Sequence, residues 1–358
     1  MKNDSRSPFT HGMEIEQFPG PLPNPVREYT MNNSCGRLTD WHNDASGPRE
    51  TSIGAYKNCK TILNRFYQDT RDEDITWDWH GAQNGAGAGS HVHLCVAGDV
   101  FDDPVTAWTI SYNTVTEIFP FLAPYFCHDW ENGFREGTSY RGSELNVEHW
   151  AEGQTTRLSQ DSVQDRVENP SSYRREYSSV TFNPAQGSGK PLTIELRAND
   201  AHPAMALNGL LTIRRVTGRA IEGGWSPKLE NHRRTLERVY EKIYRRATDV
   251  GLITAMKEPI EGGITFQEGR GIPGVDQREF ETAWEVLRAI QVAYPQTPNT
   301  WRCRAYNLVR TGRDEYSPAN NTEALWNIDA DQGEFSWQHG PDDHTSAAGA
   351  DAAEEVDA

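Results

Sequence analysis

The 358-residue chain has little lysine, few cysteines and no long apolar run, and each shortage excludes a class of protein. Lysine supplies only seven of the 35 basic residues, against 52 Asp and Glu, so the formal net charge is −17. Proteins that bind the nucleic-acid backbone carry a basic patch or stripe, and no such stripe is present. We therefore expect no nucleic-acid partner.

The five cysteines are scattered, odd in number and include no CxxC pair: Cys35, Cys59, Cys95, Cys127 and Cys303. This pattern argues against a zinc ribbon, a redox dithiol or a disulfide framework, and favours reduced thiols. The N-terminal stretch "MKNDSRSPFTHG" lacks an apolar signal region, and no run approaches eighteen apolar residues. We expect a cytoplasmic protein with no membrane partner.

An acid excess with scarce lysine is typical of proteins that work in concentrated salt. The screening length falls to roughly 3 Å near 1 M salt, which mutes the self-repulsion of such a charge. The alternative is an ordinary acidic cytosolic protein. Eleven Trp, thirteen Tyr and twelve Phe supply enough bulky apolar material for a folded core in either case.

Hydrophobic periodicity predicts a mixed, α+β order of elements. Strands are expected at 11–18, through "GSHVHLCV" at 89–96, and in a hairpin of 177–183 with 192–198. Helices are expected from an Asp-Pro start near residue 103 and over 203–222, 228–250 and 276–293, which makes the last third helical. Residues 131–176 read as long loops, candidates for a lid over a site.

The chain divides into a short N-terminal extension at 1–10, one domain at 11–328, and an acidic tail at 329–358. The tail contains no Lys or Arg and is rich in Ala, Gly and acidic residues. Such a composition buries too little apolar surface to fold, so the tail is expected to be disordered.

Three of the expected strands each carry a polar pair at i and i+2, a spacing that puts both side chains on the same face. The pairs are Glu14 with Glu16, His91 with His93, and Glu195 with Arg197. Taken alone, an ExE pair is typical of a solvated strand face and an ExR pair of a cross-strand ion pair, while an HxH pair is either an ordinary pair without a metal or a zinc half-site. A sheet that joined the three strands would gather three carboxylates, two imidazoles and a guanidinium on one surface.

Burying such a cluster costs several kcal/mol per uncompensated ion, which a bound divalent cation offsets. Carboxylate oxygens with an occasional imidazole suit Mg²⁺ or Mn²⁺, and these ions commonly hold polyphosphate. The glycine-rich run at 81–89, just before His91, would let the backbone approach phosphate oxygens closely.

In this order, the segments "GMEIE", "NDASGPRE", "GSHVH" and "TIELRANDAHPAMALNGLL" resemble the glutamine synthetase-like carboxylate–amine ligases. This superfamily includes glutamine synthetases, glutamate–cysteine ligases and the smaller amidoligases. The resemblance covers residues 10–222 and implies a curved, mainly antiparallel sheet flanked by helices. The small N-terminal domain of glutamine synthetases has no counterpart before the ExE strand, so the chain is closer to a lone amidoligase. A monomer or small homo-oligomer is expected.

The resemblance implies a role for each matched position. Glu14, Glu16 and Glu195 match carboxylates that ligate the catalytic metal ions, and His91 matches a metal-binding imidazole. His93 matches the imidazole nearer the nucleotide phosphates.

Further positions are matched more loosely. Glu50 is the candidate for one more metal ligand, and Asp44 and Ser46 are candidate substrate contacts. Arg197 matches the guanidinium that faces the transferring phosphoryl group or the acid substrate. Two more arginines, Arg175 in "RREYSSVTFN" and Arg141 in "SYRGSELN", are candidates for binding phosphate, with surface salt bridges as the alternative for both.

The resemblance thus implies an enzyme that uses ATP with Mg²⁺ or Mn²⁺ to join a small-molecule or peptide carboxylate to an amine. A metal-dependent hydrolase is one alternative, although the additional histidines and late catalytic aspartate that usually accompany HxH are not evident. A non-catalytic interaction or assembly module that keeps the ligase fold is the other.

Overall fold

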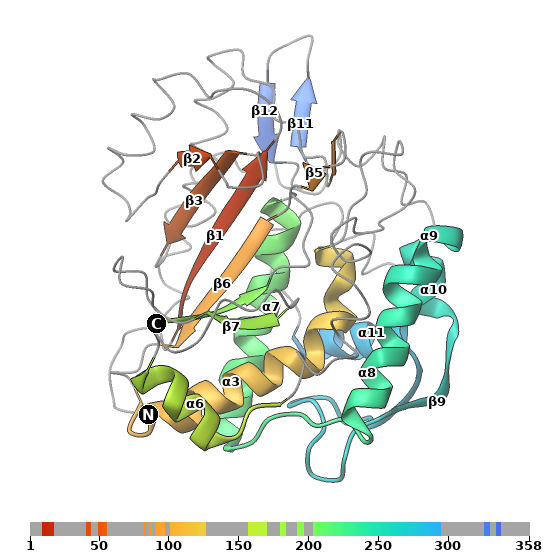
Figure 1. Ribbon diagram of the computed structural model, residues 1–358. Helices are drawn as coiled ribbons and strands as arrows, with labels where there is room; N and C mark the ends of the chain where they lie inside the picture. Colours follow the sequence, from red (N-terminus) through yellow and green to blue (C-terminus); the bar gives the residue numbers. More distant parts are fainter. Residues whose placement is uncertain are drawn as a thin grey trace.

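The computed structural model describes residues 9–17, 41–43, 49–55, 82–83, 86–87, 90–96, 101–126, 157–169, 180–183, 192–196, 203–294, 326–329 and 334–337. This part of the chain combines helices with antiparallel sheets (Figure 1). The predicted mixture of α and β structure is confirmed at that level. None of the helices described here is long and apolar enough to cross a bilayer.

The largest sheet has six antiparallel strands in the order β2-β3-β1-β6-β8-β7. The strands are β1 (Phe9–Gln17), β2 (Trp41–Asn43), β3 (Arg49–Ala55), β6 (Ser90–Val96), β7 (Val180–Asn183) and β8 (Thr193–Leu196). The pairing of β7 with β8 confirms the predicted hairpin. Three adjacent strands, β1, β6 and β8, are those expected to carry the polar pairs. A two-residue ladder, β4 (Ala82–Gln83) with β5 (Ala86–Gly87), forms within the glycine-rich run.

One face of strands β6, β7 and β8 is apolar. Val92, Leu94 and Val96 alternate along β6 and are buried, as are Ile194 and Leu196 of β8. Alternation with a period of two is what a strand with one face against a core requires. This face packs on helices α3 (Pro104–Ile118) and α7 (Pro203–Gly223).

Helix α3 begins where the sequence predicted. Asp103 is its N-cap: the carboxylate accepts hydrogen bonds from the hydroxyl and the backbone N–H of Thr106, and Pro104 occupies the first turn. These hydrogen bonds hold the pKa of Asp103 below its usual value. The cap and the proline together fix the start of the helix.

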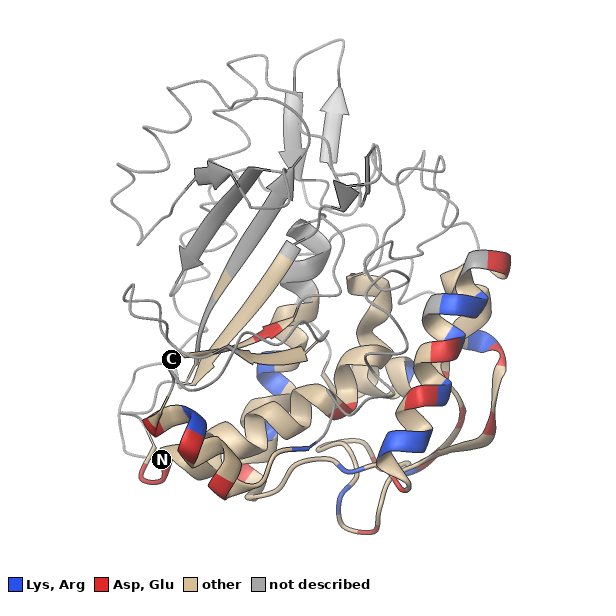
Figure 2. Cartoon of the chain, in the orientation of Figure 1, with Lys and Arg blue, Asp and Glu red and all other residues tan. Residues whose placement is uncertain are grey.

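Helix α3 is almost free of charge, whereas α6 (Gln160–Glu168) and α8 (His232–Tyr240) carry several charges of both signs (Figure 2). Trp108 and Tyr112 of α3 meet Phe182 of β7 edge-on, with ring centroids 5.4 and 5.9 Å apart. The helix continues into an entirely buried apolar turn, η2 (Phe119–Tyr125). Helix α3 is therefore an internal element shared by the sheet and by the helices that follow it.

The C-terminal part of the described chain adds helices and one hairpin. Its elements are α8, η4 (Glu241–Arg246), α9 (Ala247–Val250), α10 (Leu252–Lys257), β9 (Pro259–Thr265), β10 (Glu279–Thr282) and α11 (Ala283–Ala293). Helices α8 and α11 both contact η2, so the second layer packs on the same buried core. The predicted helices at 203–222 and 228–250 are confirmed apart from their ends.

The helix predicted over 276–293 is wrong in its first half. Phe280 lies in β10 and is buried, and α11 begins only at Ala283. The boundary is a capping box in which Thr282 accepts from the backbone N–H of Glu285 and the Glu285 side chain accepts from the backbone of Thr282.

The long loop predicted over 131–176 is also wrong in part, because α6 falls within it. Ser159 caps this helix, and Val163 is its one fully buried side chain. Strand β1 begins at Phe9, and a further hairpin joins β11 (Trp326–Asp329) to β12 (Glu334–Trp337). The predicted division of the chain at residues 10 and 329 stays a prediction.

Candidate functional site

The registers of the six-stranded sheet bring the predicted metal-site positions together. Glu14 of β1 is paired with His91 of β6, and Glu16 is paired with Glu50 of β3. On the other side of β6, His93 is paired with Glu195 of β8. Residues directly opposite each other in an antiparallel pair share a face of the sheet.

We call the face that carries these positions the polar face: Glu14, Glu16, Glu50, His91, His93 and Glu195. The intervening positions of β6 and β8 face the core on the opposite side. A shift of one residue in either register would exchange the two faces, so the apolar core fixes which residues the polar face contains. For Glu14, Glu16 and Glu50 the structure describes the strand position and not the side chain.

Two of the described side chains on the polar face form a buried acid–imidazole pair. Nδ1 of His91 lies 3.4 Å from Oε1 of Glu195, and their side chains are 3% and 0% exposed. A fully buried carboxylate is costly unless a cation or hydrogen bonds compensate it. A protonated imidazole or a divalent ion would supply that charge.

The second imidazole is held by a threonine. Nδ1 of half-buried His93 lies 3.1 Å from Oγ1 of Thr193, which belongs to the same strand as Glu195. Thr181 of β7 is paired with Glu195 from the other side. It is fully buried, and its hydroxyl has no hydrogen-bond partner among the described residues.

The donor set of the polar face fits a hard divalent cation. Carboxylate oxygens from Glu195 and from the three glutamate positions, with the His91 imidazole, are the ligand types that Mg²⁺ and Mn²⁺ accept. Among the described side chains, no three of His, Cys, Asp and Glu converge on a point. His91 and Glu195 are accordingly two candidate ligands whose partners would come from β1 and β3.

Several predicted site residues lie outside the described part of the chain. These are Asp44, Ser46, Arg141, Arg175 and Arg197. Asp44 directly follows β2, and Arg197 directly follows β8, which ends at Leu196. Their predicted roles in binding substrate and phosphate stay predictions.

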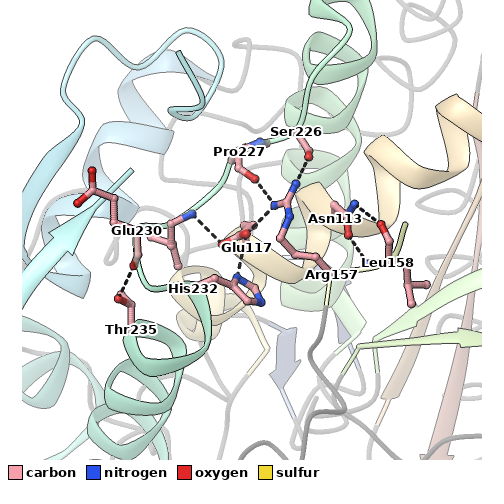
Figure 3. A network of polar contacts seen from close by, with 10 residues as sticks. Asn113, Glu117, Arg157, Leu158, Ser226, Pro227, Glu230, His232 and Thr235 are labelled. Carbon is pink, nitrogen blue, oxygen red and sulfur yellow. Dashed lines mark hydrogen bonds and ion pairs between the residues drawn. The ribbon is translucent and has the colours of Figure 1, made fainter. Parts of the chain in front are cut away.

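The structure also contains a buried charged network that the sequence did not indicate (Figure 3). Glu117, fully buried at the end of α3, lies 2.6 Å from Nη1 of Arg157 and 2.9 Å from Nδ1 of His232. It also accepts a hydrogen bond from the backbone N–H of Leu229. The signal that could have revealed it is a lone glutamate in an otherwise uncharged helix.

Arg157 connects this network to the segment between α7 and α8. Its guanidinium donates to the carbonyl of Pro227 and to the hydroxyl of Ser226, both in that segment. Asn113, one turn before Glu117, exchanges two hydrogen bonds of 2.9 Å with the backbone of Leu158. The network ties two segments to α3: the one that precedes α6 and the one that leads from α7 into α8.

No family model matches this chain, and no curated protein matches it either.

Proposed function

We propose that the protein is an ATP-dependent carboxylate–amine ligase of the glutamine synthetase-like type. The observation that supports this most is the register of the sheet. It puts the ExE glutamates of β1, the HxH histidines of β6 and Glu195 of β8 on one face. Three short motifs spread over some 180 residues of sequence thus lie on adjacent strands, an arrangement that a shared site requires. The finer fold expected from the resemblance, a curved sheet of the glutamine synthetase catalytic type, belongs to the same proposal.

The proposed reaction has two steps. The γ-phosphoryl group of ATP passes to an oxygen of the substrate carboxylate, which releases ADP and gives an acyl phosphate. The amine then attacks the acyl carbon, loses a proton and expels inorganic phosphate, which leaves an amide. Neither step needs a protein nucleophile, so catalysis rests on positioning and electrostatics.

The polar face supplies the groups for this chemistry. Mg²⁺ or Mn²⁺ would neutralise charge on the phosphoryl oxygens, and Glu14, Glu16, Glu50, His91 and Glu195 would hold it. The imidazole of His93 would contact the nucleotide phosphates. The three arginines, Arg197, Arg175 and Arg141, would bind phosphate or the acid substrate through their forked guanidinium groups.

Transfer of an isotope tests the reaction directly. A pool of amino acids with ¹⁸O in every carboxyl group, incubated with ATP, Mg²⁺ and an amine mixture in high salt, should give inorganic phosphate that carries one ¹⁸O atom. The label moves because the carboxylate oxygen leaves with phosphate when the amine attacks. A metal-dependent hydrolase would leave the phosphate unlabelled, and an interaction module would release none.

The matched variants separate the site from the rest of the protein. Glu195→Gln should abolish labelled phosphate release, whereas Glu268→Gln should not, because Glu268 lies exposed in the β9–β10 connection. Equal release from both variants would contradict the assignment of the polar face.

A further inference from the structure

The register of the sheet adds a histidine to the polar face that the sequence motifs did not indicate. His42 of β2 is paired with Glu50 of β3, and Glu50 is paired with Glu16 of β1. Residues directly opposite each other share a face, so the three positions form one row across three adjacent strands. For His42, as for the two glutamates, the structure describes the strand position.

The spacing of this row suits a shared ligand. Neighbouring strands are roughly 4.8 Å apart, so the outer positions, His42 and Glu16, are separated by about 10 Å with Glu50 between them. Side chains as long as those of histidine and glutamate span half of that separation. The row thus offers two carboxylates and one imidazole to an ion above its middle position.

Charge gives a separate reason for a cation at this place. Glu16 and Glu50 are directly opposite each other, and like charges in that relation destabilise a sheet unless something neutralises them. A second sign that the face takes a ligand comes from Thr181, which is paired with Glu195. Its fully buried hydroxyl has no hydrogen-bond partner among the described residues, although buried hydroxyls are normally satisfied.

We propose that His42 is a further metal ligand, which with Glu16 and Glu50 makes the polar face select Mn²⁺ over Mg²⁺. Mg²⁺ prefers an all-oxygen shell and keeps several of its waters, whereas first-row transition ions accept imidazole nitrogen. An imidazole in the row therefore favours Mn²⁺, while carboxylates alone would accept either ion. The inference rests on the metal site of the proposed function and not on the ligase reaction.

Calorimetric titration with each metal alone, without nucleotide and at a fixed potassium chloride concentration, tests this inference. Wild type should bind Mn²⁺ more tightly than Mg²⁺. His42→Ala should weaken Mn²⁺ binding at least tenfold, because even residues that only orient metal ligands contribute about that much. Mg²⁺ binding should change far less. Asn43→Ala is the matched control and should leave both affinities unchanged, because Asn43 is the next residue on β2 and belongs to the opposite face.

His42→Asp separates the imidazole from the mere presence of a ligand. It keeps a donor at this position and should bind both metals, with the preference for Mn²⁺ lost. The circular dichroism spectrum of each variant confirms folding before titration. An Mn²⁺ affinity that is unchanged in His42→Ala, an equal loss for both metals, an equal loss in Asn43→Ala, or a wild type that binds neither metal would overturn the inference. A protein that meets these expectations and binds no ATP would overturn the proposed function alone.

Discussion

Two fully buried glutamates of this protein, Glu117 and Glu195, have different surroundings. Glu117 is enclosed by Arg157, His232 and a backbone N–H, which together satisfy both of its oxygens. Glu195 lies on the polar face, 3.4 Å from His91, which is a longer contact. The first arrangement stabilises the fold, whereas the second places a carboxylate and an imidazole on the face that we propose binds a cation.

Replacing Glu117 by glutamine should destabilise the protein by roughly 2–4 kcal/mol, because Arg157 would keep a largely buried charge without its partner. The free energy of unfolding in urea, at a fixed salt concentration, measures this effect. Glu168→Gln, on the exposed side of α6, is the matched control and should change the free energy of unfolding by less than about 0.5 kcal/mol. Equal changes in the two variants would show that the Glu117 network does not contribute to stability beyond an exposed residue.

Tyr294, at the end of α11, supplies a pH-dependent signal. Its hydroxyl donates to the carbonyl of Pro273, and burial raises its pKa from 10.0 to about 12. Because the folded pKa is raised, its stabilising contribution is present below pH 10 and is lost as the pH rises through about 12. The difference between the ultraviolet titration curves of wild type and Tyr294→Phe should show a phenol that ionises near pH 12. A difference curve centred near 10 would contradict the burial of this ring.

At the scale of elements, the two faces of β6 have different surroundings. Leu94 faces the core and is almost completely buried, whereas its neighbour Cys95 is half-buried on the other face. Leu94→Ala should cost about 3 kcal/mol of unfolding free energy, and Cys95→Ala less than about 1 kcal/mol. Urea midpoints of the two variants check the register. A larger loss of unfolding free energy in Cys95→Ala than in Leu94→Ala would mean that the opposite face of β6 packs on the core.

Local patterns made some elements predictable from sequence. The alternation of histidine with Val92 and Leu94 predicted a strand, because the pattern of a half-buried strand repeats every two residues. The start of α3 was predictable because aspartate at the N-cap and proline in the first turn, here Asp103 and Pro104, are typical of helix starts. The sequence also predicted that the glutamates of β1, the histidines of β6 and Glu195 of β8 share one face, but the strand order depends on pairings between distant segments, which only the folded chain displays.

Other elements could not be predicted from local patterns, for physical reasons. The stretch before α11 continues the helical pattern, so the strand of Glu279–Thr282 was missed; the Thr282–Glu285 capping box was the available signal. Helix α6 was missed because it buries one residue, Val163, and so shows almost no periodicity. The Glu117 network joins residues more than 100 positions apart, and no local pattern reports such a contact.

At the scale of the whole molecule, the formal net charge of −17 predicts how stability responds to salt. Charges of one sign repel one another in the compact state, and salt screens that repulsion. The described surface pairs, such as Arg233 with Glu237, are exposed and contribute little, so losing them to screening costs little. The melting temperature should therefore rise with potassium chloride concentration. A melting temperature that falls with added salt would contradict this, and calorimetric scans decide between the two.

Calorimetric titration with ATP tests most directly whether the polar face binds a metal–nucleotide complex. In high salt, wild type should bind ATP with Mg²⁺ or Mn²⁺ and not without a metal. His91→Ala and Glu195→Gln should both lose this binding, while Glu268→Gln retains it. If folded wild type binds no ATP with either metal, or if the polar-face variants bind as the control does, the polar face is not a nucleotide site and the ligase proposal fails.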